Sequence, residues 1–189
     1  MRRGILEALA AVAASAAVLV GCQAESPTAG DADAAPESLA ASEATRAAQA
    51  SAASTDLATL RRVTARYHSF ERAQADGYTA KLTECMASAE GGMGYHYGHP
   101  SLIDGGVDVA APEVLLYEPQ RNGQLRLVGV EYVVPFDAWR APESPVLFGQ
   151  HFHRNDSFEL WALHVWVWRH NPSGLFADWN PNVSCTDAR

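Results

Sequence analysis

The sequence predicts an α+β domain in which an N-terminal amphipathic helix packs on a curved antiparallel sheet. Apolar residues recur every three or four positions between Asp56 and Gln74, which places them on one face of a helix. Two apolar segments flank Asn122-Gly123, a dipeptide typical of tight β-hairpins. A small closed β-barrel is the alternative architecture.

The first residues have the layout of a secretory signal. Arg2 and Arg3 precede an apolar run from Ile5 to Val20, which is shorter than the about 20 residues of a membrane-spanning helix. The run ends in Leu19-Val20-Gly21-Cys22, which resembles the lipobox of bacterial lipoproteins. The resemblance implies removal of residues 1–21, acylation of Cys22 and lipid anchoring on the extracytoplasmic side of a membrane in the cell envelope. An uncleaved anchor or a buried helix is the alternative.

Residues 22–52 are rich in Ala, Ser, Pro and acidic residues and contain no aromatic residue. Such a composition buries too little apolar surface to offset the entropy lost on folding. We therefore expect a disordered tether, with a transient helix over Glu37–Ala50, followed by a single globular domain at residues 53–189.

The predicted helix begins near Ser54 or Thr55, whose hydroxyl groups suit an N-cap, and ends before Gly77. Its apolar stripe consists of Leu57, Leu60, Val63, Tyr67 and Phe70.

Lipidation of Cys22 leaves Cys85 and Cys185 as a pair. In an oxidising compartment we expect these two residues to form a disulfide. The bridge would close a loop of roughly 100 residues and stabilise the fold by about 4–5 kcal/mol in the chain-entropy estimate. Two separate buried thiols are the alternative.

The hairpin strands are expected at Val114–Glu118 and Leu125–Val134, and a central strand, apolar on both faces, at Phe158–Trp168. In the second hairpin strand, alternation places Glu131 among apolar neighbours, where a carboxylate needs an ionic partner, a proton or a metal ion.

The histidines around the last strand predict a metal site. His151 and His153 lie two positions apart and therefore share a face of an extended chain. With His164, and with His96 or Glu131 to complete the ligands, they suit zinc, copper or iron. The alternative is a core role for His164 and an exposed loop for His151 and His153.

Aromatic side chains also suggest a pocket for a small-molecule ligand. The candidate ligand-binding residues are Tyr95, Tyr97, Trp166 and Trp168. No Gly-x-Ser-x-Gly motif marks a serine nucleophile, and the spacing of Glu131 from Glu113 or Glu118, which decides a glycosidase mechanism, is not set by the sequence.

The charge argues against a nucleic-acid partner. The formal net charge is −8 and the arginines are scattered, whereas nucleic-acid-binding domains present clustered basic residues. Membrane association is expected to come from the lipid at Cys22 rather than from a basic surface.

Six short segments between residues 55 and 185 resemble an uncharacterised family of secreted bacterial proteins. They are Asp76-Gly77-Tyr78, Gly92–Tyr97, Leu127–Tyr132, Leu147–Gln150, Leu163–Trp166 and Trp179-Asn180-Pro181. The resemblance implies one domain and no particular activity. The sequence thus predicts an envelope lipoprotein that binds a small ligand or a metal ion; the alternatives are a metal-dependent enzyme and a structural or interaction module.

Overall fold

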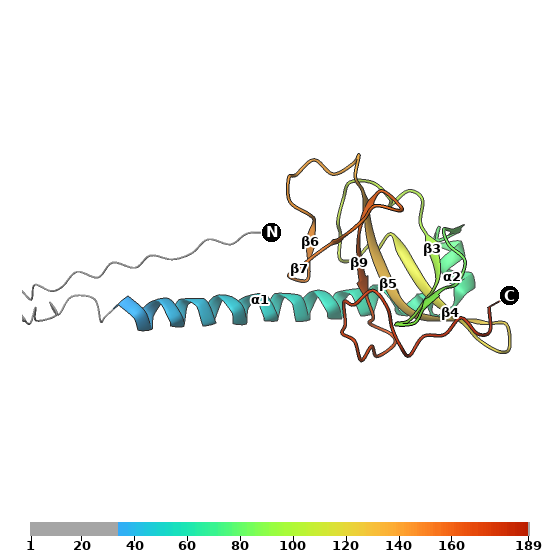
Figure 1. Cartoon of the computed structure of the whole chain (residues 1–189), viewed down its shortest axis with the longest axis horizontal. Coiled ribbons are helices and arrows are strands. Elements are labelled where there is room, and N and C mark those ends of the chain that lie inside the picture. The colour runs from blue at the N-terminus through green and yellow to red at the C-terminus, as the bar shows by residue number, and fades with distance from the viewer. Residues whose placement is uncertain (1–33, 189) are drawn as a thin grey trace, which may run out of the picture. The chain divides into compact units, whose positions relative to one another are not determined.

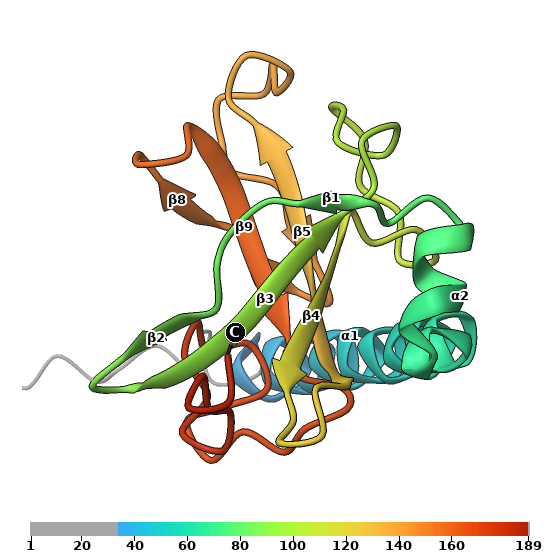
Figure 2. The same ribbon diagram turned by 90° about the vertical axis from the view of Figure 1, so that its right-hand side faces the viewer.

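The computed structural model describes residues 34–188 and confirms the α+β class (Figures 1 and 2). Residues 41–188 belong to one compact unit, and Ala34–Ala40 belongs to a separate one. The predicted signal and Cys22 lie outside the described residues. The helical segments are α1 (Ala34–Thr64), the 3₁₀ turn η1 (Ala65–His68) and α2 (Phe70–Ala75). The strands are β1 (Ala80–Lys81), β2 (Met86–Ser88), β3 (Gly91–Gly98), β4 (Val114–Pro119), β5 (Leu125–Pro135), β6 (Val146–Leu147), β7 (Gln150–His151), β8 (His153–Asn155) and β9 (Leu160–Val165).

The helical part differs from the predicted single helix over Asp56–Gln74. Helix α1 begins at Ala34, so residues 34–52 of the predicted tether are helical. Thr55 lies inside α1, where its hydroxyl donates to the carbonyl of Ser51 (3.1 Å). Helix α1 ends at Thr64, η1 follows, and the helical backbone is interrupted at Ser69, whose backbone is extended and whose Oγ accepts a hydrogen bond from the backbone N–H of Arg72 (3.2 Å). Serine favours this N-cap geometry, so the expected continuous helix becomes two.

The main sheet is antiparallel throughout and has the strand order β1-β3-β4-β5-β9-β8, with β2 paired to β3. Within the described residues this sheet is open, so the barrel alternative is wrong. Strands β4 and β5 form the hairpin predicted from Asn122-Gly123, and Gly123 has the positive φ of 80° that such a turn requires. Strands β6 and β7 form a separate pair.

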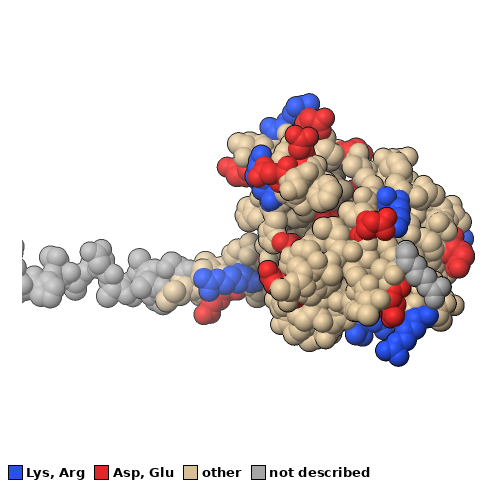
Figure 3. Space-filling view, turned by 45° about the vertical axis from the view of Figure 1, so that its right-hand side comes forward, with Lys and Arg blue, Asp and Glu red and all other residues tan. Residues whose placement is uncertain are grey.

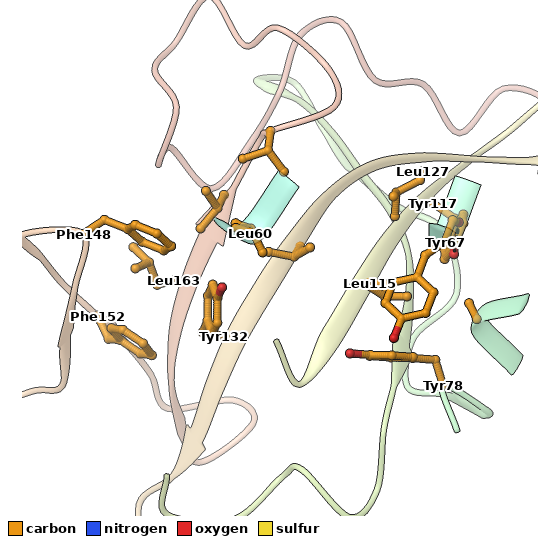
Figure 4. Packing of buried hydrophobic residues seen from close by; sticks show 14 of the residues in the cluster. Leu60, Tyr67, Tyr78, Leu115, Tyr117, Leu127, Tyr132, Phe148, Phe152 and Leu163 are labelled. Atoms are coloured by element: carbon orange, nitrogen blue, oxygen red, sulfur yellow. Dashed lines mark hydrogen bonds between the residues drawn. The ribbon is translucent and has the colours of Figure 1, made fainter. Parts of the chain in front are cut away.

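One face of the sheet packs against the helical segments. Leu60 of α1 and Tyr67 of η1 are buried among side chains of β4, β5 and β9, including Tyr132 and Leu163 (Figure 4). Two hydrogen bonds join the layers: the Tyr117 hydroxyl donates to the carbonyl of Tyr67 (2.7 Å), and the Trp168 indole N–H donates to the Thr64 hydroxyl (3.1 Å).

The opposite face carries a smaller apolar cluster and the polar candidates. The cluster is formed by Val114, Leu116, Val128, Val133, Trp166 and Val183. An irregularity in the β4–β5 register pairs Leu116 with Gly129 but Tyr117 with Leu127. A β-bulge changes which face later residues occupy. Leu127 accordingly packs on the helix side, whereas uninterrupted alternation along the strand would place it on the same face as Glu131.

The C-terminal segment lies against the start of β3. Gly92 and Asn180 exchange two backbone hydrogen bonds of 3.1 Å. Gly91 has φ +136°, and a Cβ there would lie 2.4 Å from the Asn180 carbonyl carbon, so the close approach depends on glycine. The predicted disulfide is confirmed: Cys85 and Cys185 are bonded, with Cα atoms 5.7 Å apart.

The disulfide indicates an oxidising, extracytoplasmic compartment. Within residues 34–188, no helix has the length and apolar character needed to cross a membrane. Acidic and basic side chains are interspersed on the face that Figure 3 shows, without an extended basic surface.

Candidate metal centre

Three buried side chains from three strands converge on the face opposite the helices. They are His96 on β3, Glu131 on β5 and His164 on β9. Glu131 and His164 are direct cross-strand partners, whereas His96 reaches them across β4. One potential ligand atom from each residue lies within 4.8 Å of the other two.

The Glu131 carboxylate offers one oxygen to each imidazole. His96 Nε2 lies 3.7 Å from Oε2, and His164 Nε2 lies 3.6 Å from Oε1. Ligands held tetrahedrally at about 2.0–2.1 Å from zinc are about 3.4 Å apart. Each of these two N···O separations is therefore within a few tenths of an ångström of the spacing between two zinc ligands.

The second ring nitrogen of each histidine lies beside another polar side chain. His96 Nδ1 is hydrogen-bonded to the Thr83 hydroxyl (2.8 Å). His164 Nδ1 lies 3.3 Å from Asp178 Oδ1, and His153 Nδ1 is 3.0 Å from the same oxygen. In metal sites such partners orient the imidazole and select the tautomer that presents the other nitrogen to the ion. Here both rings direct Nε2 towards Glu131.

Among the described residues, His164 is the buried side chain with the most polar atoms left without a hydrogen bond. It is only 4% exposed, and neither ring nitrogen makes a hydrogen bond of acceptable geometry with any residue in the described chain. The nearby Asp178 and Glu131 oxygens are at ion-pair distances without hydrogen-bond alignment. A buried imidazole in this condition is costly unless a neighbouring opposite charge or a bound ligand compensates it.

Burial and the neighbouring charges shift three pKa values. Burial lowers the pKa of His96, which favours the neutral ring that can bind a metal. Burial also opposes the charge on His164, but Glu131 and then Asp178 outweigh it, so the pKa of His164 is raised. Close contact with His164, reinforced by His153, lowers the pKa of Asp178 to about 2 despite its partial burial.

A cavity of about 260 Å³ lies over the three residues. Its wall is largely apolar and is formed by Leu82, Met86, Met93, Ile103, Val133, Phe158 and Leu160. The remaining lining residues are Thr83, His96, Glu131, Asn155 and His164. The triad of His96, Glu131 and His164 therefore forms a small polar surface in the wall of a largely apolar cavity.

The other two predicted metal ligands, His151 and His153, do not join His96, Glu131 and His164. His151 lies on β7, in the separate two-stranded sheet, and its Nδ1 is hydrogen-bonded to the Ser144 hydroxyl (3.0 Å). His153, on β8, has an exposed side chain and contacts Asp178 rather than the triad. The intervening Phe152 is buried in the helix-side core. The pair therefore does not form one face of a continuous strand.

The four candidate ligand-binding aromatics are dispersed. Trp166 stacks on His164 with ring centroids 6.0 Å apart and donates its indole N–H to the Ala177 carbonyl. Tyr97 and Trp168 pack against the helix-side core, and Tyr95 lies beside Lys81. None of the four lines the cavity over the triad.

Asp178 and Thr83 were not among the candidates from the sequence. Both lie in loops without a recognisable motif, and each reaches its histidine only through the fold.

Comparison with known proteins found no matching family model, curated protein or solved structure.

Proposed function

We propose that this domain binds one divalent transition-metal ion through His96 Nε2, a Glu131 oxygen and His164 Nε2. The observation that carries the proposal is the convergence of these three buried groups at separations of 3.6–3.7 Å between paired atoms. These separations exceed the 2.7–3.2 Å range of N–H···O hydrogen bonds. The groups are thus gathered without hydrogen bonds to one another, and an ion between them would take a ligand atom from all three.

The ligand chemistry narrows the choice of metal. Two imidazoles and one carboxylate match zinc sites, and the same set with open positions suits non-haem iron(II). Copper also accepts imidazole ligands. We propose zinc as the ion to test first because the three ligands can occupy three corners of a tetrahedron.

The proposal is tested by metal analysis of residues 22–189 carrying Cys22→Ser, the expected processed chain without its lipid. The purified protein is stripped with a chelator, reloaded separately with zinc, copper and iron(II), desalted and analysed by mass spectrometry. We expect one ion per chain. His164→Ala and Glu131→Gln should reduce binding at least about 100-fold, whereas the matched control His151→Ala should bind as the parent does. Absence of stoichiometric metal after reloading would refute the proposal.

A metal-dependent enzyme is the second candidate function. It is favoured by the number of protein ligands, because three ligands leave a coordination position for water or substrate, as in catalytic zinc sites. The open position would face the cavity. If the loaded protein hydrolyses small esters, the rate should disappear on chelation and return with the metal; a rate that is unaffected by chelation would exclude metal catalysis.

The lipobox resemblance supports a further part of the proposal, that Cys22 is acylated and anchors the protein in the cell envelope. The disulfide is consistent with export. Cys22→Ser should release the protein from the membrane fraction, and metabolic labelling with a fatty acid should be lost at the same time. An unlabelled parent or unchanged fractionation of the mutant would contradict lipidation.

A further inference from the structure

We propose that the cavity over the metal centre binds a medium-chain monocarboxylate, with the carboxylate on the metal ion and the alkyl chain against the apolar wall. This inference rests on the proposed metal function and specifies the ligand class of the same site.

The wall offers contacts for a hydrocarbon chain and few for polar groups. Seven of its lining residues are apolar, from Leu82 near β1 to Leu160 on β9. Two of its polar groups are already engaged: Thr83 is hydrogen-bonded to His96, and the Asn155 side-chain carbonyl accepts from the backbone N–H of Phe158 (3.3 Å). A sugar or a nucleotide would have to bury polar groups against this wall without partners, at a cost in free energy.

The charges determine the head group. No lysine or arginine lines the cavity, so the protein itself offers no cation to an anionic ligand. With neutral histidines, a divalent ion and its direct ligand Glu131 sum to one positive charge, and the Asp178 carboxylate lies behind His164, at its Nδ1. One carboxylate neutralises that charge and fills the coordination position that three protein ligands leave open.

The volume of the cavity sets the length of the ligand's alkyl chain. At about 30 Å³ for each water-sized group, a volume of 260 Å³ accommodates roughly nine non-hydrogen atoms. This corresponds to a carboxylate of about six to eight carbons. Leu82 and Phe158 line the cavity while remaining 45% and 52% exposed. They mark an apolar mouth, beyond which a longer chain would extend into water.

The test is isothermal titration calorimetry of acetate, butyrate, hexanoate, octanoate and dodecanoate into zinc-loaded residues 22–189 with Cys22→Ser. The metal content is measured on the same sample. We expect the affinity to rise about fourfold per methylene group, equivalent to ~0.8 kcal/mol, and to level off near octanoate. Octan-1-ol, which has the same chain without the charge, should bind at least about tenfold more weakly than octanoate because it leaves the metal charge uncompensated.

Phe158→Ser and Val146→Ser form a matched pair. Phe158 and Val146 are 52% and 51% exposed, but only Phe158 lines the cavity. Phe158→Ser should weaken octanoate binding about three- to tenfold through lost apolar contact while leaving acetate binding unchanged. Val146→Ser should alter neither.

Each outcome bears on the inference separately from the metal site. Stoichiometric zinc with equal affinities for acetate and octanoate would overturn the monocarboxylate inference and leave the proposed metal function standing. Octanoate binding of equal strength to the metal-free protein would overturn the role of the metal in holding the head group. Failure to bind zinc would overturn both proposals.

Discussion

Removal of the Cys85–Cys185 disulfide should lower the stability of the fold strongly and alter the metal centre little. The bridge joins residues 100 apart in sequence, and the chain-entropy model gives about 4.7 kcal/mol for a loop of roughly 100 residues. Measured bridges often contribute less than the model. We therefore expect the Cys85→Ser/Cys185→Ser variant to lose about 3–4 kcal/mol of unfolding free energy.

The metal centre should be spared because other contacts hold the C-terminal segment close to Asp178. Asn180 is fully buried and exchanges two backbone hydrogen bonds with Gly92. Val183, 4% exposed, packs in the cluster on the same face of the sheet. These contacts lie between Asp178 and Cys185 and do not require the bridge, so the affinity for zinc should stay within about threefold of the parent value.

Urea denaturation followed by circular dichroism measures the stability change in the metal-free protein, with Cys22→Ser as the background. The dependence on urea should steepen because the reduced unfolded chain exposes more surface. A stability loss under about 1 kcal/mol would refute the loop-entropy account. A fall in zinc affinity of more than about tenfold would show that the disulfide itself positions Asp178.

Three further changes test the site and the fold. Asp178→Ala and Thr83→Val should each weaken metal binding about 10–100-fold, because each removes the partner that orients one imidazole. Metal affinity is measured by competition titration, and an unchanged affinity would show that these contacts do not position the ligands. Burial raises the pKa of Glu113 to about 8 from its ordinary value of 4.5, although its carboxylate accepts a hydrogen bond from the Val133 N–H. The stabilising contribution of Glu113 is therefore complete below about pH 4.5 and lost as the pH rises through about 8. Glu113→Gln should reduce the fall in unfolding free energy between pH 5 and 9 by about 2–4 kcal/mol. Identical pH profiles of unfolding free energy for the parent and the variant would refute this assignment. Leu60 is fully buried in the helix-side core, so Leu60→Ala should lower the unfolding free energy measured in urea by about 2–5 kcal/mol. A loss under about 0.5 kcal/mol, as for a typical surface substitution, would show that α1 does not cover this face of the sheet.

The sequence predicted structural elements correctly where the pattern that determines them is local. The Asn122-Gly123 turn and the apolar segments beside it predicted the β4–β5 hairpin, which the structure confirms. The fold class and the cysteine pairing are confirmed as well. The helix boundaries were wrong because an alanine-rich stretch continues α1 upstream to Ala34 and because Ser69 adopts a capping conformation.

Side-chain faces were harder to predict because alternation holds only in an uninterrupted strand. The register irregularity beside Gly129 moves Leu127 away from the Glu131 face. The strand predicted at Phe158–Trp168 ends at Val165, and beyond it Trp168 packs towards α1, whereas continued alternation would place it on the face of His164. The same reasoning fails for His151 and His153, which belong to different sheets.

The sequence alone determined that Glu131 sits in an apolar strand and needs a partner, since its neighbours in the chain establish that surrounding. It also supplied His96 and His164 as candidates. Only the tertiary structure selected them, because the strand order β3-β4-β5-β9 and its register place their rings on one face with Glu131. Asp178 and Thr83 join them through loop contacts made across more than ten residues of chain. Such contacts depend on packing of the whole domain, which local periodicity does not encode.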